Sequence, residues 1–293
     1  MKKVSLLLLA FALVLNTAHA QNNSNKSLLW EVSGKGLTAP SYLFGTYHFA
    51  AKSLVDSLSD IKKYFNSCKA VVGEVLMDST EMEKLVDEMI LPDTITLNKL
   101  YTADEYKFIG DYVTQVTKMD MRALAHFKPA TIQVMLLSFI MPKTFSGLNP
   151  AIDMYFQQEG KRRNDKVLGF ETMKEQSDLL FGTPMDQQKK ALLESIRKKD
   201  EAKTEGEKLY ALYLQQDLDG IDKLITNALA KEKTPELSDK MLKDRNLKWI
   251  TKIPAIVSEQ PTFIAVGAAH LVGQYGLINQ LRLKGYTVKP VKI

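Results

Sequence analysis

Strand-like segments lie close to the two ends of this chain, about 200 residues apart, and the long stretch between them has mostly helical patterns. Near the start, the apolar runs 28–32 and 41–44 flank a Gly34-Lys-Gly36 turn, which predicts a β-hairpin. Helical spacing of apolar residues over 53–65 is followed by another apolar run, 70–76. The first 76 residues therefore predict strands joined by a short helix.

The last 32 residues predict a second group of strands. Two apolar segments, 262–266 and 286–291, enclose a helical pattern from His270 to Lys284 that stops at Gly285. This order is typical of a βαβ unit with parallel strands. Neither end has enough strands to form a sheet alone. We therefore predict an α/β fold with one central mixed sheet built from both ends of the chain and a large helical insertion.

The predicted helical insertion extends over about residues 100–253. Thr102 and Glu105 form a capping-box pattern that opens a helix ending near Lys118. A second apolar helix is expected over 129–139, and Asn149-Pro150 has the cap-and-proline pattern of a helix start. The run 166–170, which is followed by Glu171, is the one strand candidate in this region. Helices are predicted again from 174 to about 253.

The first 20 residues have the layout of a secretory signal peptide. Lys2 and Lys3 precede a largely apolar stretch of twelve residues, and small residues at Ala18 and Ala20 precede the predicted cleavage site. Twelve residues are too few to cross a bilayer, which needs about 20. We expect cleavage after Ala20, a single domain over 21–293 with no membrane span, and a periplasmic or secreted location.

Charge and cysteine usage narrow the possible partners. The formal net charge is +5, and loss of the two signal-peptide lysines leaves +3, which gives no support for nucleic-acid binding. Cys68 is the only cysteine in the sequence, so no disulfide can form within the chain. We interpret Cys68 as a small apolar residue at the start of a strand.

The two ends of the chain share one pattern, an apolar strand followed by Gly-x-x-His. It occurs at Gly45 to His48 and again at Gly267 to His270. With 15 Gly and 4 His in the chain, two such cases arise by chance with a probability of roughly 0.02. Glycine permits a close turn at the end of a strand, and the carboxyl edge of an α/β sheet is where ligands bind. The pattern thus favours a site with both histidines, although a strand-end histidine alone is more often structural.

Two carboxylates are candidates for the same site. Glu74 interrupts an apolar strand next to the first Gly-x-x-His segment, and Glu171 follows the strand candidate in the middle. A buried charge is costly unless it is paired or bound to a metal. Two imidazoles and a carboxylate would suit a divalent Mn, Co, Fe or Zn ion. Alternatively, Glu74 forms a structural ion pair with Arg245 or a lysine.

Arg245 is predicted to point inward. On a helix from 238 to 253 it lies three residues after Leu242 and four before Trp249, along the apolar stripe. An inward arginine needs an acidic or oxyanionic partner. By contrast, Asp153 is interpreted as complementing a helix dipole, and His126 as structural or exposed.

At these residues the sequence resembles the TraB/GumN family, which includes the Tiki-type metalloproteases. The matching segments are Leu28-Leu-Trp-Glu-Val, Tyr42-Leu-Phe-Gly-Thr-Tyr-His48, Gly73-Glu74, Gly169-Phe-Glu171-Thr, Arg245-Asn246 and Val266-Gly-Ala-Ala-His270-Leu. The resemblance implies a fold like that of the erythromycin esterase and Tiki group, with His48, His270 and Glu74 at the active centre. Many relatives carry a second acid shortly after this glutamate, and Asp78 is its nearest candidate here.

What the resemblance implies about activity is metal-dependent peptide hydrolysis in Tiki-like members, with manganese or cobalt as the ion. TraB-like members are associated with shutting down peptide pheromone signals. Our leading hypothesis is an exported metal-dependent hydrolase of peptides or proteins. His48, Glu74 and His270 would hold the metal, Glu171 would act as base and Arg245 would hold the oxyanion.

Two alternatives keep the same residues. In one, a His–Glu pair activates water without a metal, as in esterase-like relatives. In the other, the protein is a non-catalytic periplasmic module that binds a peptide or an envelope partner. No His-Glu-x-x-His, Gly-x-Ser-x-Gly or phosphate-loop motif is present in the sequence, so other common hydrolase mechanisms have no support.

Overall fold

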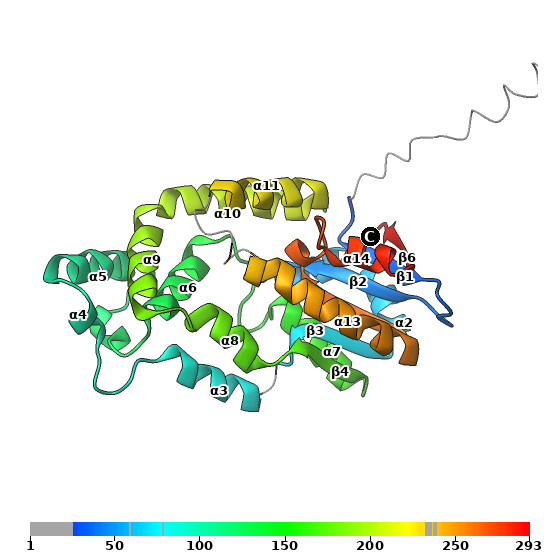
Figure 1. Ribbon diagram of the computed structural model, residues 1–293, viewed down its shortest axis with the longest axis horizontal. Coiled ribbons are helices and arrows are strands. Elements are labelled where there is room, and N and C mark those ends of the chain that lie inside the picture. Colours follow the sequence, from blue (N-terminus) through cyan, green and yellow to red (C-terminus); the bar gives the residue numbers. More distant parts are fainter. Residues whose placement is uncertain (1–25, 59, 78, 232–235, 237–238) are drawn as a thin grey trace, which may run out of the picture.

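The computed structural model describes residues 26–58, 60–77, 79–231, 236 and 239–293 (Figure 1). The predicted signal peptide and the alternative acid Asp78 lie outside these residues. In the part of the chain that the structure describes, none of the helices is both long and apolar enough to cross a membrane.

The core of the protein is one mixed six-stranded sheet with the strand order β4-β3-β5-β2-β1-β6. Strands from both ends of the chain build it, as predicted, and β4 from the middle forms one edge. The four strands β4, β3, β5 and β2 are parallel, and β1 runs antiparallel between β2 and β6. The strands are β1 (Leu29–Ser33), β2 (Ser41–Thr46), β3 (Ala70–Val75), β4 (Lys166–Glu171), β5 (Thr262–Gly267) and β6 (Thr287–Val291).

The predicted N-terminal hairpin is confirmed, with Leu29 opposite Phe44 and Val32 opposite Ser41. Glu74, however, does not lie on a strand beside the first Gly-x-x-His strand, because β5 is inserted between β2 and β3. This insertion is a long-range pairing that the local pattern does not encode. It places the strand that carries the second Gly-x-x-His pattern between the other two.

The structure differs from the predicted C-terminal βαβ unit in two respects. β5 and β6 run in the same direction, as predicted, but β2 and β1 separate them in the sheet. The helix predicted from His270 begins only at α14 (Leu277–Leu283), after the short 3₁₀ turn η3 (Ala268–His270). Gly273 has a φ of 77°, which ends any helix there, and Gly276 is the N-cap of α14.

Two further helix boundaries differ from the prediction. The helix expected over 53–65 is split into α1 (Lys52–Ser57) and α2 (Ile61–Ser67), because Leu58 is extended with φ −87° and ψ 109°. Asn149 does not cap α7 (Ile152–Arg162), the helix that follows it, but contacts the first turn of α1. Its Oδ1 accepts a hydrogen bond from the backbone N–H of Ser53, and α7 starts after Ala151.

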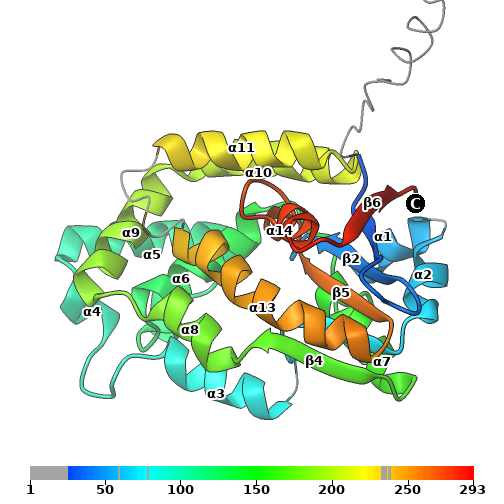
Figure 2. The ribbon, with the colours of Figure 1, turned by 45° about the vertical axis from the view of Figure 1, so that its right-hand side comes forward.

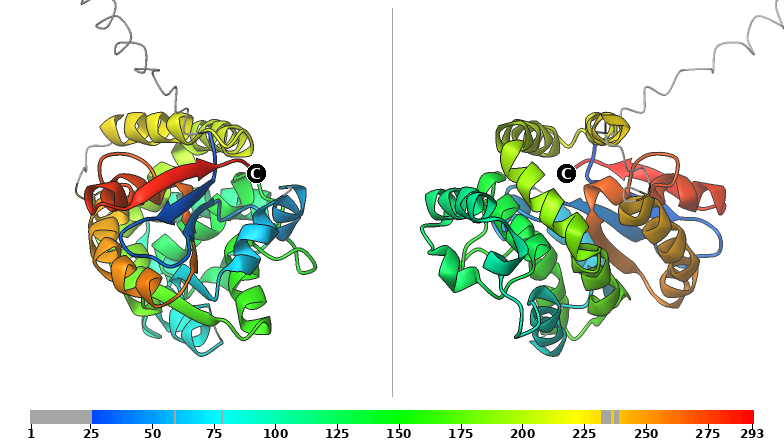
Figure 3. Two further views of the ribbon diagram at one scale, coloured as in Figure 1. Left: turned by 90° about the vertical axis from the view of Figure 1, so that its right-hand side faces the viewer. Right: turned by 60° about the vertical axis from the view of Figure 1, so that its left-hand side comes forward.

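Helices cover both faces of the sheet (Figure 3, left). On one face, α2 and α7 bury aromatic rings, among them Phe65 and Phe156, against Phe44 and Phe263. On the other face, α13 (Asp244–Glu259) stacks Trp249 on Phe170 of β4. A π-helical turn, η2 (Asp239–Lys243), leads directly into α13.

The other helices of the middle form a lobe beside the sheet, which we call the helical lobe (Figures 1 and 2). It has a separate cluster of buried apolar residues, including Ile109, Ile132 and Leu192. The predicted capping box at Thr102 and Glu105 is present. The lobe contains α3 (Ser79–Met89), α4 (Leu97–Leu100), α5 (Ala103–Thr117), η1 (Met121–Leu124), α6 (Pro129–Ile140), α8 (Met173–Phe181), α9 (Met185–Arg197), α10 (Lys199–Leu214) and α11 (Leu218–Lys231).

Candidate functional site

The predicted site residues come from the carboxyl ends of four parallel strands. His48 follows β2, His270 follows β5, and Glu74 and Glu171 lie in the last residues of β3 and β4. Packing favours the glycine at the end of β2, since a Cβ on Gly45 would lie 3.1 Å from Ala268, tighter than an ordinary contact. Because these strand ends share one edge of the sheet, side chains that are far apart in sequence meet there.

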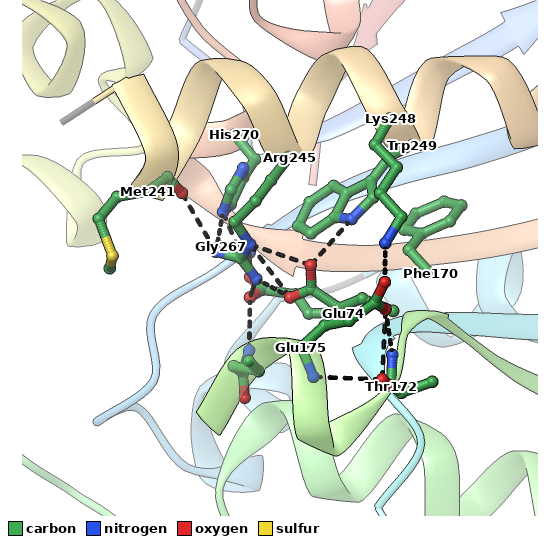
Figure 4. A network of polar contacts seen from close by, with 12 residues as sticks. Glu74, Phe170, Thr172, Glu175, Met241, Arg245, Lys248, Trp249, Gly267 and His270 are labelled. Atoms are coloured by element: carbon green, nitrogen blue, oxygen red, sulfur yellow. Dashed lines mark hydrogen bonds and ion pairs between the residues drawn. The ribbon is translucent and has the colours of Figure 1, made fainter. Parts of the chain in front are cut away.

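Glu74 is the centre of this arrangement, and its side chain is almost fully buried (Figure 4). Its Oε1 accepts a hydrogen bond of 2.8 Å from the backbone N–H of Gly267. The same oxygen lies 4.0 Å from Nε2 of His48 and 3.8 Å from Nε2 of His270. Burial alone would raise the pKa of Glu74, but the neighbouring imidazoles, Arg245 and the Gly267 N–H lower it to about 2.

Gly267 leaves a small space among the three predicted ligands. A Cβ built on this glycine would lie 3.2 Å from Oε1 of Glu74, 3.6 Å from Nε2 of His48 and 3.6 Å from Cδ2 of His270. All three side chains therefore border the position of the missing methyl group, His270 through its ring carbon Cδ2, and a methyl group would be in tight contact with Glu74 there. We call this space the Gly267 pocket.

Arg245 reaches the same centre from α13, on the inward stripe that its helical spacing predicted (Figure 4). Its Nη2 donates to Oε2 of Glu74 at 2.6 Å, and its Nε donates to Oε1 of Glu171 at 3.0 Å. Its guanidinium carbon lies 4.7 Å from the ring centre of Trp249, whose Nε1 also donates to Glu171. One arginine thus bridges the two carboxylates predicted for the site.

His48 is the most open member of the site, with 61% of its side chain exposed. Its Nδ1 lies 3.2 Å from Oδ2 of Asp153, whose Oδ1 accepts a hydrogen bond of 2.6 Å from the hydroxyl of Thr46. Partial desolvation acts to lower the pKa of His48, but the carboxylates of Asp153 and Glu74 outweigh it and raise this pKa to about 9. Asp153 therefore has a direct contact with the site, whereas the sequence had suggested only a role at a helix dipole.

His270 is buried and has a different environment. Its Nδ1 lies 2.7 Å from Oδ1 of Asn246, and its Nε2 lies 3.0 Å from Nη1 of Arg245. Burial lowers the pKa of His270 to about 4, so the ring is neutral at pH 7. The site thus contains one imidazole that readily holds a proton and one that does not.

Sequence reasoning missed three contributors, namely Asp153, Asn246 and Gln176. Gln176 extends from α8 of the helical lobe, and its Nε2 lies 3.4 Å from Oε2 of Glu74. These are ordinary polar residues on helices, and each belongs to the site because it contacts a residue more than 20 positions away in the sequence. The adjacency of Asn246 to Arg245 was the one available signal.

The residue types at the Gly267 pocket fit a divalent ion, namely two imidazole nitrogens and one carboxylate oxygen. Ligand atoms at about 2.1 Å from a tetrahedral ion are about 3.4 Å apart. The observed separations are 3.8 and 4.0 Å, so binding of a shared ion would draw these atoms slightly closer together. Among the described residues, however, no three His, Cys, Asp or Glu side chains are arranged as a ready metal site. Arg245 pairs with Glu74 and faces His270 in this arrangement.

The fold and the site define an α/β protein with a buried centre of histidine, glutamate and arginine at the carboxyl edge of its parallel strands. The profile of the TraB/PrgY/gumN family matches residues 28–290, and the chain belongs to this family.

Two relatives are named as metalloproteases. The chain is 24% identical to "Metalloprotease TIKI2" of Danio rerio, over 90% of this chain and 60% of that protein. It is 22% identical to the protein of the same name from Xenopus tropicalis, over 90% of this chain and 59% of that protein. The chain therefore spans about 60% of the length of these relatives. No solved structure matches it.

Proposed function

We propose that this protein is a metal-dependent hydrolase that cleaves amide bonds in peptides or proteins, with His48, Glu74 and His270 holding a divalent ion. The observation that carries the proposal is the convergence of these three side chains on the Gly267 pocket. The similarity to proteins named metalloproteases supports the same class of reaction. Manganese or cobalt is the preferred ion, and zinc or iron are alternatives.

A divalent ion in this position would supply polarisation of the substrate carbonyl and a water of lowered pKa. The residues of the chain would orient the substrate. Arg245 lies at the edge of the pocket, but its N–H groups already contact Glu74, Glu171, His270 and the carbonyl of Met241. For Arg245 to hold an oxyanion, the substrate oxygen would have to replace one of these partners. Both oxygens of Glu171 are engaged by Arg245 and Trp249. Glu171 is therefore better placed to hold Arg245 than to act as the free base that the sequence suggested.

Export is part of the proposal. The predicted signal peptide, with cleavage after Ala20, would direct a single-domain mature protein to the periplasm or the cell exterior. A substrate in that compartment would be an extracellular peptide or an envelope protein. The proposal also includes a relationship of the fold and active centre to those of the erythromycin esterase and Tiki group.

The test begins with the metal content of the protein produced from the full-length chain. Elemental analysis is carried out on the wild type, on the His48→Ala, His270→Ala double variant and on a control, His126→Ala, which removes an exposed histidine. We expect near-stoichiometric Mn, Co, Fe or Zn in the wild type and the control, and none in the double variant. Mass spectrometry of the same samples checks cleavage after Ala20.

Activity is measured next, by mass spectrometry of a peptide library incubated with each protein and its preferred ion. Cleavage by the wild type and the control, but not by the double variant, supports the proposal. Equal metal content or equal cleavage in all three proteins overturns the assignment of these histidines.

One observation favours a second candidate. Arg245 forms an ion pair with Glu74 and another with Glu171, so each carboxylate of the centre already has a partner within the chain. Such a centre also suits metal-free hydrolysis or a non-catalytic module that binds a peptide. Peptide cleavage that persists in chelator identifies the first of these, and peptide binding without products identifies the second.

A further inference from the structure

The amide of Asn246 has its orientation fixed by two backbone carbonyls. Its Nδ2 donates to the carbonyl oxygen of His270 at 3.1 Å and to that of Tyr275 at 3.0 Å. Carbonyl oxygens only accept hydrogen bonds, so the NH₂ group must face them and Oδ1 must face the other way. On that other side, Oδ1 lies 2.7 Å from Nδ1 of His270. Asn246 is 2% exposed, so water offers no alternative partner.

This contact determines which nitrogen of His270 carries the proton. An amide oxygen has no proton to donate, so a contact of 2.7 Å requires a proton on Nδ1. At the opposite side of the ring, Nε2 lies 3.0 Å from Nη1 of Arg245, and a guanidinium group only donates. Nε2 must therefore accept, and a proton on this nitrogen would face the N–H of Arg245. Two independent contacts thus give the same tautomer.

The unprotonated nitrogen of this tautomer lies on the side of the ring that faces Glu74. The unprotonated Nε2 lies 3.8 Å from Oε1 of Glu74, next to the Gly267 pocket. The His270 ring also packs against Trp249, with 4.4 Å between the ring centres, which resists rotation. We infer that Asn246 is a positioning residue that holds His270 as the Nδ1–H tautomer, with an unprotonated Nε2 that accepts from Arg245 beside Glu74.

This inference deepens the proposed function and rests on it for its purpose, because His270 can bind a metal or act as a base through Nε2 only if that nitrogen carries no proton. The tautomer itself does not depend on metal or activity. In free histidine the proton is found mainly on Nε2, so the protein has to select the other form. Loss of the Asn246 oxygen removes one of the two contacts that select it.

The experiment is a long-range ¹H–¹⁵N correlation spectrum of the full chain with ¹⁵N-labelled histidine, recorded at pH 7 in chelator. The chain has 4 histidines, and the spectrum of a His270→Ala variant assigns the signals of His270. We expect the Nδ1–H pattern in the wild type and a shift toward Nε2–H or an averaged pattern in Asn246→Leu.

Asn279→Leu is the matched control. Asn279 donates to the carbonyl of Gln274, in the loop that Asn246 also holds, but it has no contact with a histidine ring. This variant should keep the wild-type pattern of His270. An Nε2–H pattern in the wild type, or an unchanged pattern in Asn246→Leu, overturns the inference. The wild-type spectrum alone decides the tautomer if Asn246→Leu does not fold.

Metal uptake separates this inference from the proposed function. If both hold, Asn246→Leu binds the added ion about 10- to 100-fold more weakly than the wild type does, and Asn279→Leu binds it normally. A wild type that binds no metal but has the Nδ1–H pattern refutes the metal site and leaves the tautomer assignment standing. A wild type that binds metal but has the Nε2–H pattern supports the metal site and refutes the tautomer assignment.

Discussion

Replacement of Arg245 by methionine tests how the charged centre is held together. Methionine keeps the length and helical preference of the side chain but removes the cation that pairs with Glu74 and Glu171. The side chains of these two glutamates are 8% and 4% exposed. Removing one partner of a buried ion pair costs about 3–5 kcal/mol, because the other charge stays buried without compensation. We therefore expect the free energy of unfolding at pH 8 to fall by about that amount.

The sign of the pH dependence follows from Glu74. Its pKa is lowered from 4.5 to about 2 in the folded chain, so its ionised form stabilises the fold above about pH 4.5. This contribution is lost as the pH falls through about 2. Without Arg245 the pKa of Glu74 moves upward and the contribution shrinks. The variant should therefore differ most from the wild type above pH 4.5, and the two proteins should converge on acidification.

A divalent cation should compensate for the missing guanidinium if the proposed metal site is correct. A ligand at 100 times its Kd stabilises the folded state by about 2.7 kcal/mol. Thermal unfolding is measured at pH 8 in chelator and then with added Mn²⁺. For a chain of this size, roughly 2–4 °C correspond to 1 kcal/mol, so we expect Tm to fall by roughly 10 °C in chelator and to recover in large part with the ion.

Arg163→Met provides the matched control. Arg163 pairs with the buried carboxylate of Asp165 and donates to the carbonyl of Cys68, outside the candidate site. Its loss should also lower Tm, but Mn²⁺ should not restore it. An Arg245→Met variant as stable as the wild type at pH 8 refutes the argument that Arg245 compensates the two carboxylates. Equal recovery of both variants with Mn²⁺ refutes the specific exchange of cation for guanidinium.

Two further substitutions address the Gly267 pocket and the exposed histidine. Gly267→Ala introduces a methyl group 3.2 Å from Oε1 of Glu74 and 3.6 Å from Nε2 of His48, so it should lower Tm in chelator slightly and abolish stabilisation by Mn²⁺. Gly147→Ala, where no atom lies within 4 Å of the new Cβ, should respond to Mn²⁺ as the wild type does, and the same response of both variants contradicts the placement of the ion. Asp153→Asn removes the carboxylate that raises the pKa of His48 and should lower this pKa from about 9 in the metal-free chain, as measured by NMR titration. An unchanged pKa of His48 would mean that Asp153 does not control its protonation.

Local features of the fold were predictable because they depend on neighbouring residues. The hairpin after Leu28 and the capping box at Thr102 involve residues that are close in sequence. The helix expected from His270 was wrong because apolar spacing alone does not reveal a turn. Gly273 and Gly276 set the backbone there and delay the helix to Leu277.

In the candidate site too, residues that stand out in a local pattern were predictable and those that depend on distant partners were not. His48, Glu74, His270 and Arg245 could be singled out because each breaks a strong local pattern, either as a polar residue at a strand end or as a charge on an apolar stripe. Their meeting at one edge follows from the parallel strands. Asp153 breaks no such pattern, because an acid in the first turn of a helix is expected from the dipole alone.

Hydrophobic periodicity and the positions of the glycines were enough to predict the class of fold, the two strand-rich ends and the residue types of the polar centre. The tertiary structure decided which strand lies between β2 and β3, that Arg245 pairs with both glutamates, and that Asp153 and Asn246 hold the two histidines. These are contacts between residues far apart in the chain. Their free energy depends on distances and burial that exist only after the strands have paired.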